Sequence, residues 1–305
     1  MKKPVFNLTS GTVVRGKWNH HAYHIIQKLG EGACGVVYLC QKNGEKYALK
    51  VGTESSRLML EVNMLKKFSK VQGVKLGPSF VDVDDWLPTE GSNYPFYVME
   101  YINGQSFSEF LKGKKKEWVG IGAMQVLSDL EHLHNAGYVF GDLKTDNLLV
   151  ADSKVQWIDV GGVTGIGRAI KEYTEFYDRG YWGYGSRRAE PSYDLFAVTM
   201  IMLETVYPQR FTAKKDPKMT LQDKLKQADL PSDYKRVISA CWQGRYHSAT
   251  EMKEALGHIL MKRVQPTKPS VRKGIQTDSS EWGEMLGVSF ISLSFYGISM
   301  WNLWL

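Results

Sequence analysis

A short polar stretch between two apolar runs constrains this chain more than any other feature. It reads Tyr-Val-Phe-Gly-Asp-Leu-Lys-Thr-Asp-Asn-Leu-Leu-Val over residues 138–150 and places Asp142, Lys144 and Asn147 at fixed offsets. A carboxylate, an ammonium group and an amide that converge in one loop suit the transfer of a phosphoryl group to a hydroxyl, with the amide oxygen on magnesium. Taken alone, the stretch could equally be an ordinary polar turn. We therefore predict a catalytic loop here and look to the rest of the chain for its partners.

The composition predicts a globular protein with a sizeable core. The chain has 305 residues, of which 43% are hydrophobic, so it is long enough for one large or two ordinary domains. A net charge of +7 favours anionic partners such as nucleotides, acidic membranes or nucleic acid, although a solvated lysine-rich surface explains it equally well. Three cysteines without metal-ligand spacing indicate a reducing compartment and argue against zinc. Since the amino end has no signal-peptide run, we expect it in the cytoplasm.

The chain divides into a mixed body, a polar linker and an apolar tail. Before residue 103, β-rich runs alternate with Gly and Asn turns around one helix-like segment, and after it helical periodicity dominates. This pattern predicts a small sheet lobe followed by a larger helical lobe. The expected strands are 23–29, 36–40, 46–51 and 96–101, and the expected helices include 124–134, stopped by Asn135-Ala136-Gly137, and 194–203. The expected segments are 1–14 (N-terminal segment), 15–102 and 103–260 (the two lobes), 261–283 (linker) and 284–305 (tail).

Three glycines, Gly30, Gly32 and Gly35, form a G-x-G-x-x-G pattern that is weak evidence by itself. A dinucleotide-binding fingerprint has to open a helix, but here β-branched residues follow, and Asn43-Gly44 then signals a tight hairpin. The glycines are thus expected between two strands. Because glycine has no side chain, such a loop can lay its backbone over phosphates.

Lys50 lies inside an apolar strand and needs an anionic partner, since a lone buried ammonium group is costly. On the following helix, Glu61 shares the apolar face of Leu58, Val62 and Leu65. We predict a buried pair of Lys50 with Glu61 that aims Lys50 at nucleotide phosphates. Glu54 is the competing partner, although it is better placed to cap the helix.

Asp159 follows an apolar strand and precedes two glycines, twelve residues after Asn147. A hairpin this short could bring both side chains onto one magnesium ion. An aspartate in a turn at a strand end is the plainer alternative.

In order and spacing, these motifs resemble the Hanks-type protein kinases, over residues 15–260. The resemblance implies an α+β, bilobal protein-kinase fold with a small antiparallel β N-lobe, a larger helical C-lobe and, here, a C-terminal hydrophobic helix. Phe196-Ala197 after Asp194 is similar to the family's buried central helix, whose aspartate steadies the catalytic loop. Within the family the chain is most similar to the membrane-anchored YabT-type kinases of spore-forming bacteria, through residues 140–144, 158–162 and 168–185.

The resemblance also implies a role for each matching residue. Asp142 would accept the proton of the substrate hydroxyl, Lys144 would steady the γ-phosphate of ATP, and Lys50 would hold the α- and β-phosphates. Asn147 and Asp159 would hold Mg²⁺. Adenine would lie between Val37 and Ala48 above and Leu149 below, with Met99 guarding the back pocket and backbone bonds from Glu100 and Ile102. Thr174 resembles the threonine that braces the catalytic-loop lysine in kinases acting on serine and threonine, so we expect protein substrates and self-phosphorylation.

Departures from the family pattern concern regulation. Phe140-Gly141 stands where most members have His-Arg, so the arginine that clamps an activation-loop phosphate is missing. We therefore predict that phosphorylation of Thr164 or Thr174 is not strictly required for activity. The Ala-Pro-Glu element is missing too, which leaves the partner of Arg245 open, with Glu190 as one alternative.

The C-terminal part predicts a membrane anchor. Residues 285–305 carry no charged side chain and are about as long as a helix that spans a bilayer, although four serines leave an interfacial helix as an alternative. Basic residues before the tail predict a single-pass protein of the cell membrane with its kinase domain in the cytoplasm. The same basic linker could contact anionic lipid or, without sequence readout, DNA.

We thus predict an ATP- and Mg²⁺-dependent serine/threonine protein kinase tethered to the membrane. A pseudokinase scaffold that binds partners or anionic surfaces, or a small-molecule kinase, is the alternative.

Overall fold

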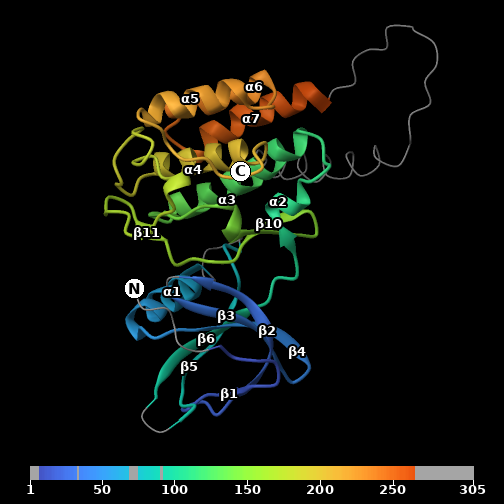
Figure 1. Cartoon of the computed structure of the whole chain (residues 1–305), viewed down its shortest axis with the longest axis vertical. Helices are drawn as coiled ribbons and strands as arrows, with labels where there is room; N and C mark the ends of the chain where they lie inside the picture. Colours follow the sequence, from blue (N-terminus) through green and yellow to red (C-terminus); the bar gives the residue numbers. More distant parts are fainter. Residues whose placement is uncertain (1–6, 33, 69–74, 90–91, 265–305) are drawn as a thin grey trace, which may run out of the picture. The chain divides into compact units, whose positions relative to one another are not determined.

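The computed structural model describes residues 7–32, 34–68, 75–89 and 92–264 (Figure 1). The first 264 residues form one compact unit. The predicted apolar tail and all but the first four residues of the predicted linker lie outside the described residues. Within the described part of the chain, no helix combines the length and the hydropathy that crossing a bilayer requires.

The N-lobe is a six-stranded antiparallel sheet with the order β1-β2-β3-β4-β6-β5 (Figure 1). Asn43 and Gly44 both have positive φ, of 53° and 87°, which is the backbone that a two-residue hairpin between β3 and β4 requires. The strands are β1 (Val13–Arg15), β2 (Ala22–Gly32), β3 (Gly35–Lys42), β4 (Glu45–Val51), β5 (Phe80–Trp86) and β6 (Tyr94–Glu100). The four predicted strands correspond to β2, β3, β4 and β6, and β1 crosses the boundary expected at residue 15.

Strand alternation gives the sheet two distinct faces. Side chains of one face, such as Tyr38, Leu49 and Val98, form a core that belongs to the N-lobe alone. Side chains of the other face, including Ala48 and Met99, join the main core together with C-lobe residues. Because successive residues of a strand point to opposite faces, this single alternation decides which side chains meet the C-lobe.

Helix α1 (Ser55–Phe68) packs on the sheet through Leu58, Val62 and Leu65. Glu61 is buried on the same face, as its helical phase predicts.

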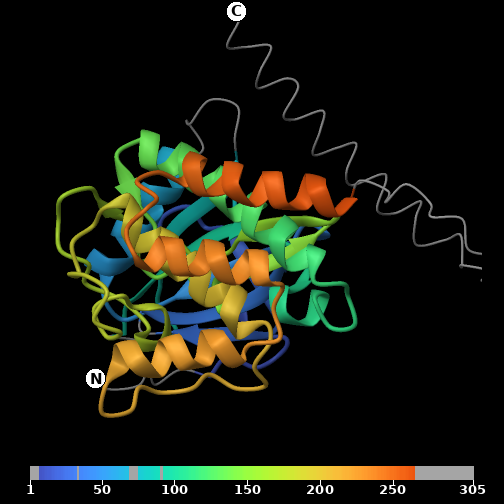
Figure 2. The same ribbon diagram turned by 90° about the horizontal axis from the view of Figure 1, so that it is seen from above.

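The C-lobe is built around α4 (Pro191–Glu204), a helix whose residues from Tyr193 to Leu203 are all buried. A helix that is apolar all round has to lie inside the protein, and α3 and α6 pack against it. Figure 2 shows α6 and α7 side by side across the lobe. The helices are α2 (Phe107–Phe110), α3 (Glu117–Asn135), α4, α5 (Pro217–Gln227), α6 (Ser232–Trp242) and α7 (Ala249–Val264), with the 3₁₀ turns η1 (Thr145–Asn147) and η2 (Glu175–Tyr177).

The short strands of the C-lobe form two small sheets, with the orders β10-β9-β7 and β11-β8. These strands are β7 (Gln105–Ser106), β8 (Tyr138–Val139), β9 (Leu148–Ala151), β10 (Lys154–Trp157) and β11 (Thr164–Gly165). The catalytic-loop sequence lies between β8 and β9, since α3 ends where predicted and Gly137 turns the chain with a φ of 86°. The bilobal kinase fold predicted from the sequence is therefore present in the described residues.

Candidate active site

Lys50 and Glu61 form the buried ion pair that the sequence predicts. The Lys50 ammonium lies 2.7 Å from Glu61 Oε2, and the two residues are only 5% and 3% exposed. A second carboxylate, that of Asp159, lies 3.8 Å from the same nitrogen. Burial works against the charged ammonium, but the carboxylates of Asp159 and Glu61 outweigh it and raise the pKa of Lys50. Lys50 is therefore a fixed cation at the cleft.

The competing partner is placed elsewhere. Glu54 pairs with Arg57 at 2.9 Å, on the exposed side of α1. Sequence reasoning missed Tyr97, whose hydroxyl donates to Glu61 at 2.7 Å and satisfies the buried carboxylate a second time. Tyr97 is directly opposite Lys50 in the β4–β6 register, so the sheet brings it to Glu61.

The catalytic loop holds Asp142 from both sides. Lys144 donates to one carboxylate oxygen at 2.5 Å, and the Thr174 hydroxyl donates to the other at 3.0 Å. Lys144 also lies 3.3 Å from the Thr174 oxygen. A threonine thirty residues away in the sequence therefore orients both the carboxylate and the ammonium group.

Asn147 and Asp159 are brought together by the β9–β10 hairpin. The amide of Ile158 donates to the Asn147 carbonyl at 3.1 Å, which ties the two positions directly. The Asn147 side-chain nitrogen donates to the Asp142 carbonyl at 3.0 Å, so its side-chain oxygen is the atom left for a cation. One amide oxygen and one carboxylate are hard donors that suit a magnesium ion sharing phosphate oxygens. The residues therefore fit the ion that the sequence predicts.

Two glycines after Asp159 let the loops approach each other. A Cβ on Gly162 would lie 2.8 Å from Cβ of Asp142, and one on Gly161 would lie 3.1 Å from Glu61 Oε1. A side chain at Gly162 would therefore push the segment that carries Asp159 away from Asp142, whereas one at Gly161 would need only a small shift of Glu61.

Asp194 supports the catalytic loop from below, as the resemblance implies. It is fully buried and accepts hydrogen bonds from the backbone amides of Phe140 at 2.7 Å and Gly141 at 3.0 Å. His134, at the end of α3, contacts the same carboxylate at 2.9 Å. Gly141 has a φ of 81°, and a Cβ there would lie 2.5 Å from the Gly162 carbonyl oxygen. An arginine at this position would therefore be incompatible with the present backbone.

The residues predicted around adenine share one face of the sheet. Val37 is directly opposite Lys50, and Ala48, two residues before Lys50, is opposite Met99. These four side chains therefore point the same way, toward the C-lobe. Leu149 is partly buried on β9, the strand that carries the chain onward from Asn147.

The predicted hinge residues Glu100 and Ile102 follow at the end of β6. The Glu100 carboxylate is held by Lys75 and by the amide of Ser79 at 3.0 Å, so its side chain is already engaged. Ile102 is buried.

The glycine loop lies between β2 and β3, as predicted. A Cβ added at Gly30 or Gly32 would meet nothing within 4 Å, so packing does not require glycine at either position. Gly35 differs, because a Cβ there would lie 2.3 Å from the Val51 carbonyl oxygen. Open space above the first two glycines is consistent with a ligand that the backbone approaches closely.

The alternative that Glu190 partners Arg245 is wrong. Glu190 pairs instead with the buried Arg179, which also donates to the Ser186 carbonyl at 2.8 Å. Asp178, fully buried, accepts from Arg187 at 2.7 Å and from Tyr193 at 3.0 Å. This network, which sequence reasoning did not find, anchors the segment before α4 in place of an Ala-Pro-Glu element. The sequence signal for this network is the pair Asp178-Arg179, because two opposite charges inside an aromatic stretch need buried partners.

The fold and the site together define the protein kinase class. The sheet lobe carries a buried lysine–glutamate pair, and a loop of the helical lobe holds an aspartate between a lysine and a threonine. Comparison with known proteins agrees. Residues 23–277 match the family model of the protein kinase domain. The chain belongs to the protein kinase family, in its Hanks-type serine/threonine branch, and the family predicted from the sequence is confirmed. Membership implies the use of ATP and a divalent cation.

Individual relatives support the same family. Serine/threonine-protein kinase YabT of Bacillus subtilis (strain 168) is 46% identical over 270 residues, covering 87% of this chain and 80% of that protein. Probable serine/threonine-protein kinase YbdM of the same organism is 29% identical over 177 residues, covering 53% of this chain and 64% of that protein. The solved structure of vaccinia related kinase 3 matches with a TM-score of 0.60 at 17% identity, over 86% of this chain and 94% of that chain, which shows the shared fold.

Proposed function

We propose that this chain transfers the γ-phosphate of ATP to serine and threonine hydroxyls of proteins, including its own. The observation that carries the proposal is the position of Lys50, which lies between Glu61 at 2.7 Å and Asp159 at 3.8 Å. Gly162 also places the segment that carries Asp159 against Asp142. Lys50, the cation for phosphates, and Asp142, the base for a hydroxyl, are therefore brought to the same site. This arrangement suits phosphoryl transfer, in which positioning and charge neutralisation do most of the work.

In the proposed reaction Asp142 orients the substrate hydroxyl and accepts its proton as the hydroxyl oxygen bonds to the γ-phosphorus. The bond from that phosphorus to the bridging oxygen breaks, and ADP leaves with the electron pair. Lys144 stabilises charge on the transferring group, while Lys50 holds the α- and β-phosphates. Asn147 and Asp159 would hold magnesium, which when bound neutralises phosphate charge. The Thr174 hydroxyl keeps Asp142 and Lys144 in register and supports serine and threonine as acceptors.

The test compares the compact unit of residues 1–264 with its Asp142→Asn variant, using labelled ATP, magnesium and a mixed protein substrate. Because loss of a general base costs about 100-fold or more, we expect label on serine and threonine in the first sample and almost none in the second. Label on a small acceptor alone would favour a small-molecule kinase. ATP binding without transfer in either sample would favour a pseudokinase scaffold.

We also propose that residues 284–305 tether the kinase to the cytoplasmic face of the cell membrane. Support comes from the uncharged run of residues 285–305, the tryptophans near its ends and the basic residues before it. In membrane fractionation the full chain should sediment with membranes and resist extraction by salt and alkali, whereas residues 1–283 should not. Release by alkali would indicate an interfacial helix instead.

The basic linker at 261–283 supports an additional contact with anionic phosphates, either of lipids or of DNA. A salt-dependent binding assay with and without residues 262–275, on acidic vesicles and on duplex DNA, separates the two.

A further inference from the structure

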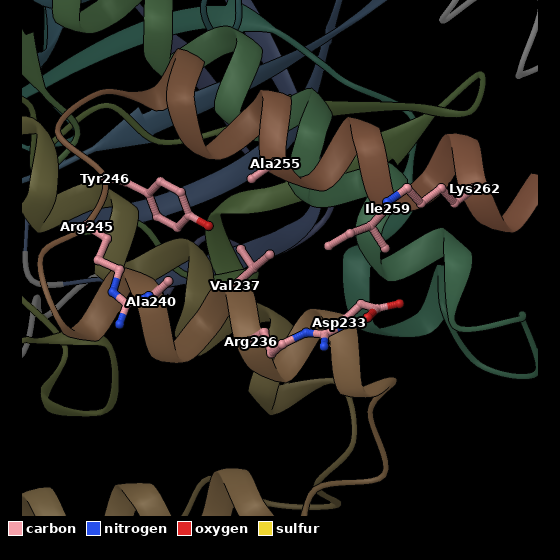
Figure 3. A pocket seen from close by; sticks show the side chains of 9 residues that line it. All are labelled: Asp233, Arg236, Val237, Ala240, Arg245, Tyr246, Ala255, Ile259 and Lys262. Atoms are coloured by element: carbon pink, nitrogen blue, oxygen red, sulfur yellow. Dashed lines mark hydrogen bonds and ion pairs between the residues drawn. The ribbon is translucent and has the colours of Figure 1, made fainter.

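A groove of about 290 Å³ runs between α6 and α7 on the C-lobe (Figure 3). Apolar side chains of both helices line it, among them Val237, Ala240 and Ile259. Figure 3 shows Arg245 toward one end of the groove and Lys262 at the other. Both helices lie on the side of the C-lobe away from the N-lobe sheet (Figure 1), so the groove is separate from the candidate active site.

Along the groove the carboxylate has ion-pair partners, whereas two of the cations have none in the described part of the chain. Asp233, the one carboxylate of the lining, already pairs with Arg236 and, at 3.4 Å, with Arg263. Arg245 and Lys262, in contrast, have no ion pair within 4.0 Å to any carboxylate in the described ranges. Two cations at the ends of an apolar groove are therefore available to an external anion.

Among the described residues Arg245 has no carboxylate partner, and the segment before α4 is anchored without it. Arg179 holds Glu190, and Arg187 holds Asp178, so both acidic residues within positions 178–190 have other arginines as partners. The arginine is thereby left in the groove as an exposed side chain.

The spacing of the cations limits what can bind. Figure 3 shows Ala255 between the two cations, and the seven residues of helix from Ala255 to Lys262 span about 10 Å, so Arg245 and Lys262 are farther apart than this. An extended peptide advances roughly 3.3 Å per residue, so acidic side chains at least four positions apart would match the two ends. An apolar side chain between them would cover Val237 and Ile259.

We propose that this groove binds an extended segment of a protein substrate in which two acidic residues, at least four positions apart, flank an apolar one. A flat lipid surface or a DNA backbone would meet the cations but leave the apolar lining uncovered, so the groove favours a peptide. The recruitment of substrates rests on the proposed kinase activity, whereas the binding itself does not.

Binding is tested by fluorescence anisotropy with the labelled peptide Gly-Asp-Ser-Leu-Ser-Glu-Gly and the full chain in detergent. We expect saturable binding, which Arg245→Glu and Lys262→Glu each weaken by about tenfold or more, because a charge-assisted hydrogen bond is lost. Lys215→Glu, a charge reversal at an exposed C-lobe position outside the groove lining, should bind as the unaltered protein does. Circular dichroism checks that every variant is folded.

Two control peptides probe the pattern itself, one with serine for leucine and one with the acids adjacent. Both should bind about tenfold more weakly. Equal binding of all three peptides, or equal binding by the Arg245→Glu variant, would overturn the proposal. Binding only to phosphatidylglycerol vesicles or to duplex DNA, with none to the peptide, would overturn it as well.

Recruitment is tested with a short serine acceptor peptide, alone and joined to the acidic segment through a flexible linker. Joining should lower KM about tenfold without changing kcat, and Arg245→Glu should abolish this advantage while leaving the short acceptor unaffected. An equal KM for both acceptors would overturn the recruitment step. If no acceptor is phosphorylated, the proposed function fails, while the anisotropy result still decides whether the groove binds the segment.

Discussion

The hydroxyl of Thr174 donates a 3.0 Å hydrogen bond to Asp142, and Lys144 donates to both residues. The three side chains thus form a closed ring in which each fixes the other two. A carboxylate held on both oxygens has little freedom to leave the geometry that proton transfer needs.

Replacing Thr174 should therefore reduce the rate of transfer more than the binding of ATP. We expect Thr174→Val to lower kcat by about tenfold or more with a nearly unchanged KM for ATP, because one of two hydrogen bonds to Asp142 is lost. Thr174→Ser keeps the hydroxyl and should retain most of the activity. Steady-state kinetics on a peptide acceptor measure both variants, and a Val variant with normal kcat would contradict the ring's role.

Activity should not depend on phosphorylation of the activation segment. The hydroxyls of Thr174 and Thr164 are both engaged, the first with Asp142 and the second with the Gly162 carbonyl. A phosphate-binding arginine cannot replace Gly141, because its Cβ would clash with the Gly162 carbonyl. A phosphatase-treated preparation, checked by mass spectrometry, should phosphorylate an acceptor from the first turnover without a lag. A dephosphorylated protein with no turnover would contradict this.

The Lys50–Glu61 pair should be sensitive to the loss of one partner. We expect Glu61→Leu to lower the free energy of unfolding by about 3 to 5 kcal/mol, since it leaves a buried ammonium group with less compensation. The double variant with Lys50→Met should recover part of that loss while both remain inactive. Urea denaturation measures the stability. Asp223→Asn, which breaks an exposed pair with Lys226, is the control and should change it by less than about 1 kcal/mol.

Alanine substitutions at Gly141 and Gly137 distinguish the cost of a left-handed backbone from the cost of a steric clash. Both have positive φ, of 81° and 86°, but an added Cβ meets the Gly162 carbonyl at Gly141 and nothing within 4 Å at Gly137. Gly137→Ala should cost about 1 kcal/mol of unfolding free energy for the left-handed backbone. Gly141→Ala should cost clearly more and should also lower activity, because the clash displaces the loop before Asp142. Similar losses at both sites in urea denaturation would refute the steric account.

Asp129 should make the stability pH-dependent. Burial in α3 raises the pKa of its carboxyl from 3.8 to about 7, and Lys154 only partly opposes this. Between about pH 4 and pH 7 the folded protein keeps a proton on Asp129 that the unfolded chain has already lost. The free energy of unfolding therefore falls as the pH rises from about 4 to 7, and this loss stays constant at higher pH. Asp129→Asn should gain on the order of 4 kcal/mol over the unaltered protein at pH 8 and little at pH 4. A stability difference that stays constant with pH would contradict the assignment.

Much of the site could be predicted from the sequence because its residues lie on regular elements or in short turns. The hairpin at Asn43-Gly44 implied that the glycine loop joins two strands, and the 3.6-residue period put Glu61 on the buried face of its helix. Strand β5 was missed because its three aspartates interrupt the apolar pattern. Two of them, Asp82 and Asp84, are nevertheless buried, and Asp82 accepts hydrogen bonds from Tyr23 and Asn19.

By itself, then, the sequence determined the family, the order of the elements and the five polar residues of the cleft, because strand and helix periods state locally which face is buried. Only the tertiary structure decided that Arg179 takes Glu190, and that Arg245 consequently faces an open groove. Those partners lie in an irregular segment with no period to follow. Which charges meet there depends on how distant parts of the chain pack, and the pairing of one arginine leaves another without a partner in the described residues.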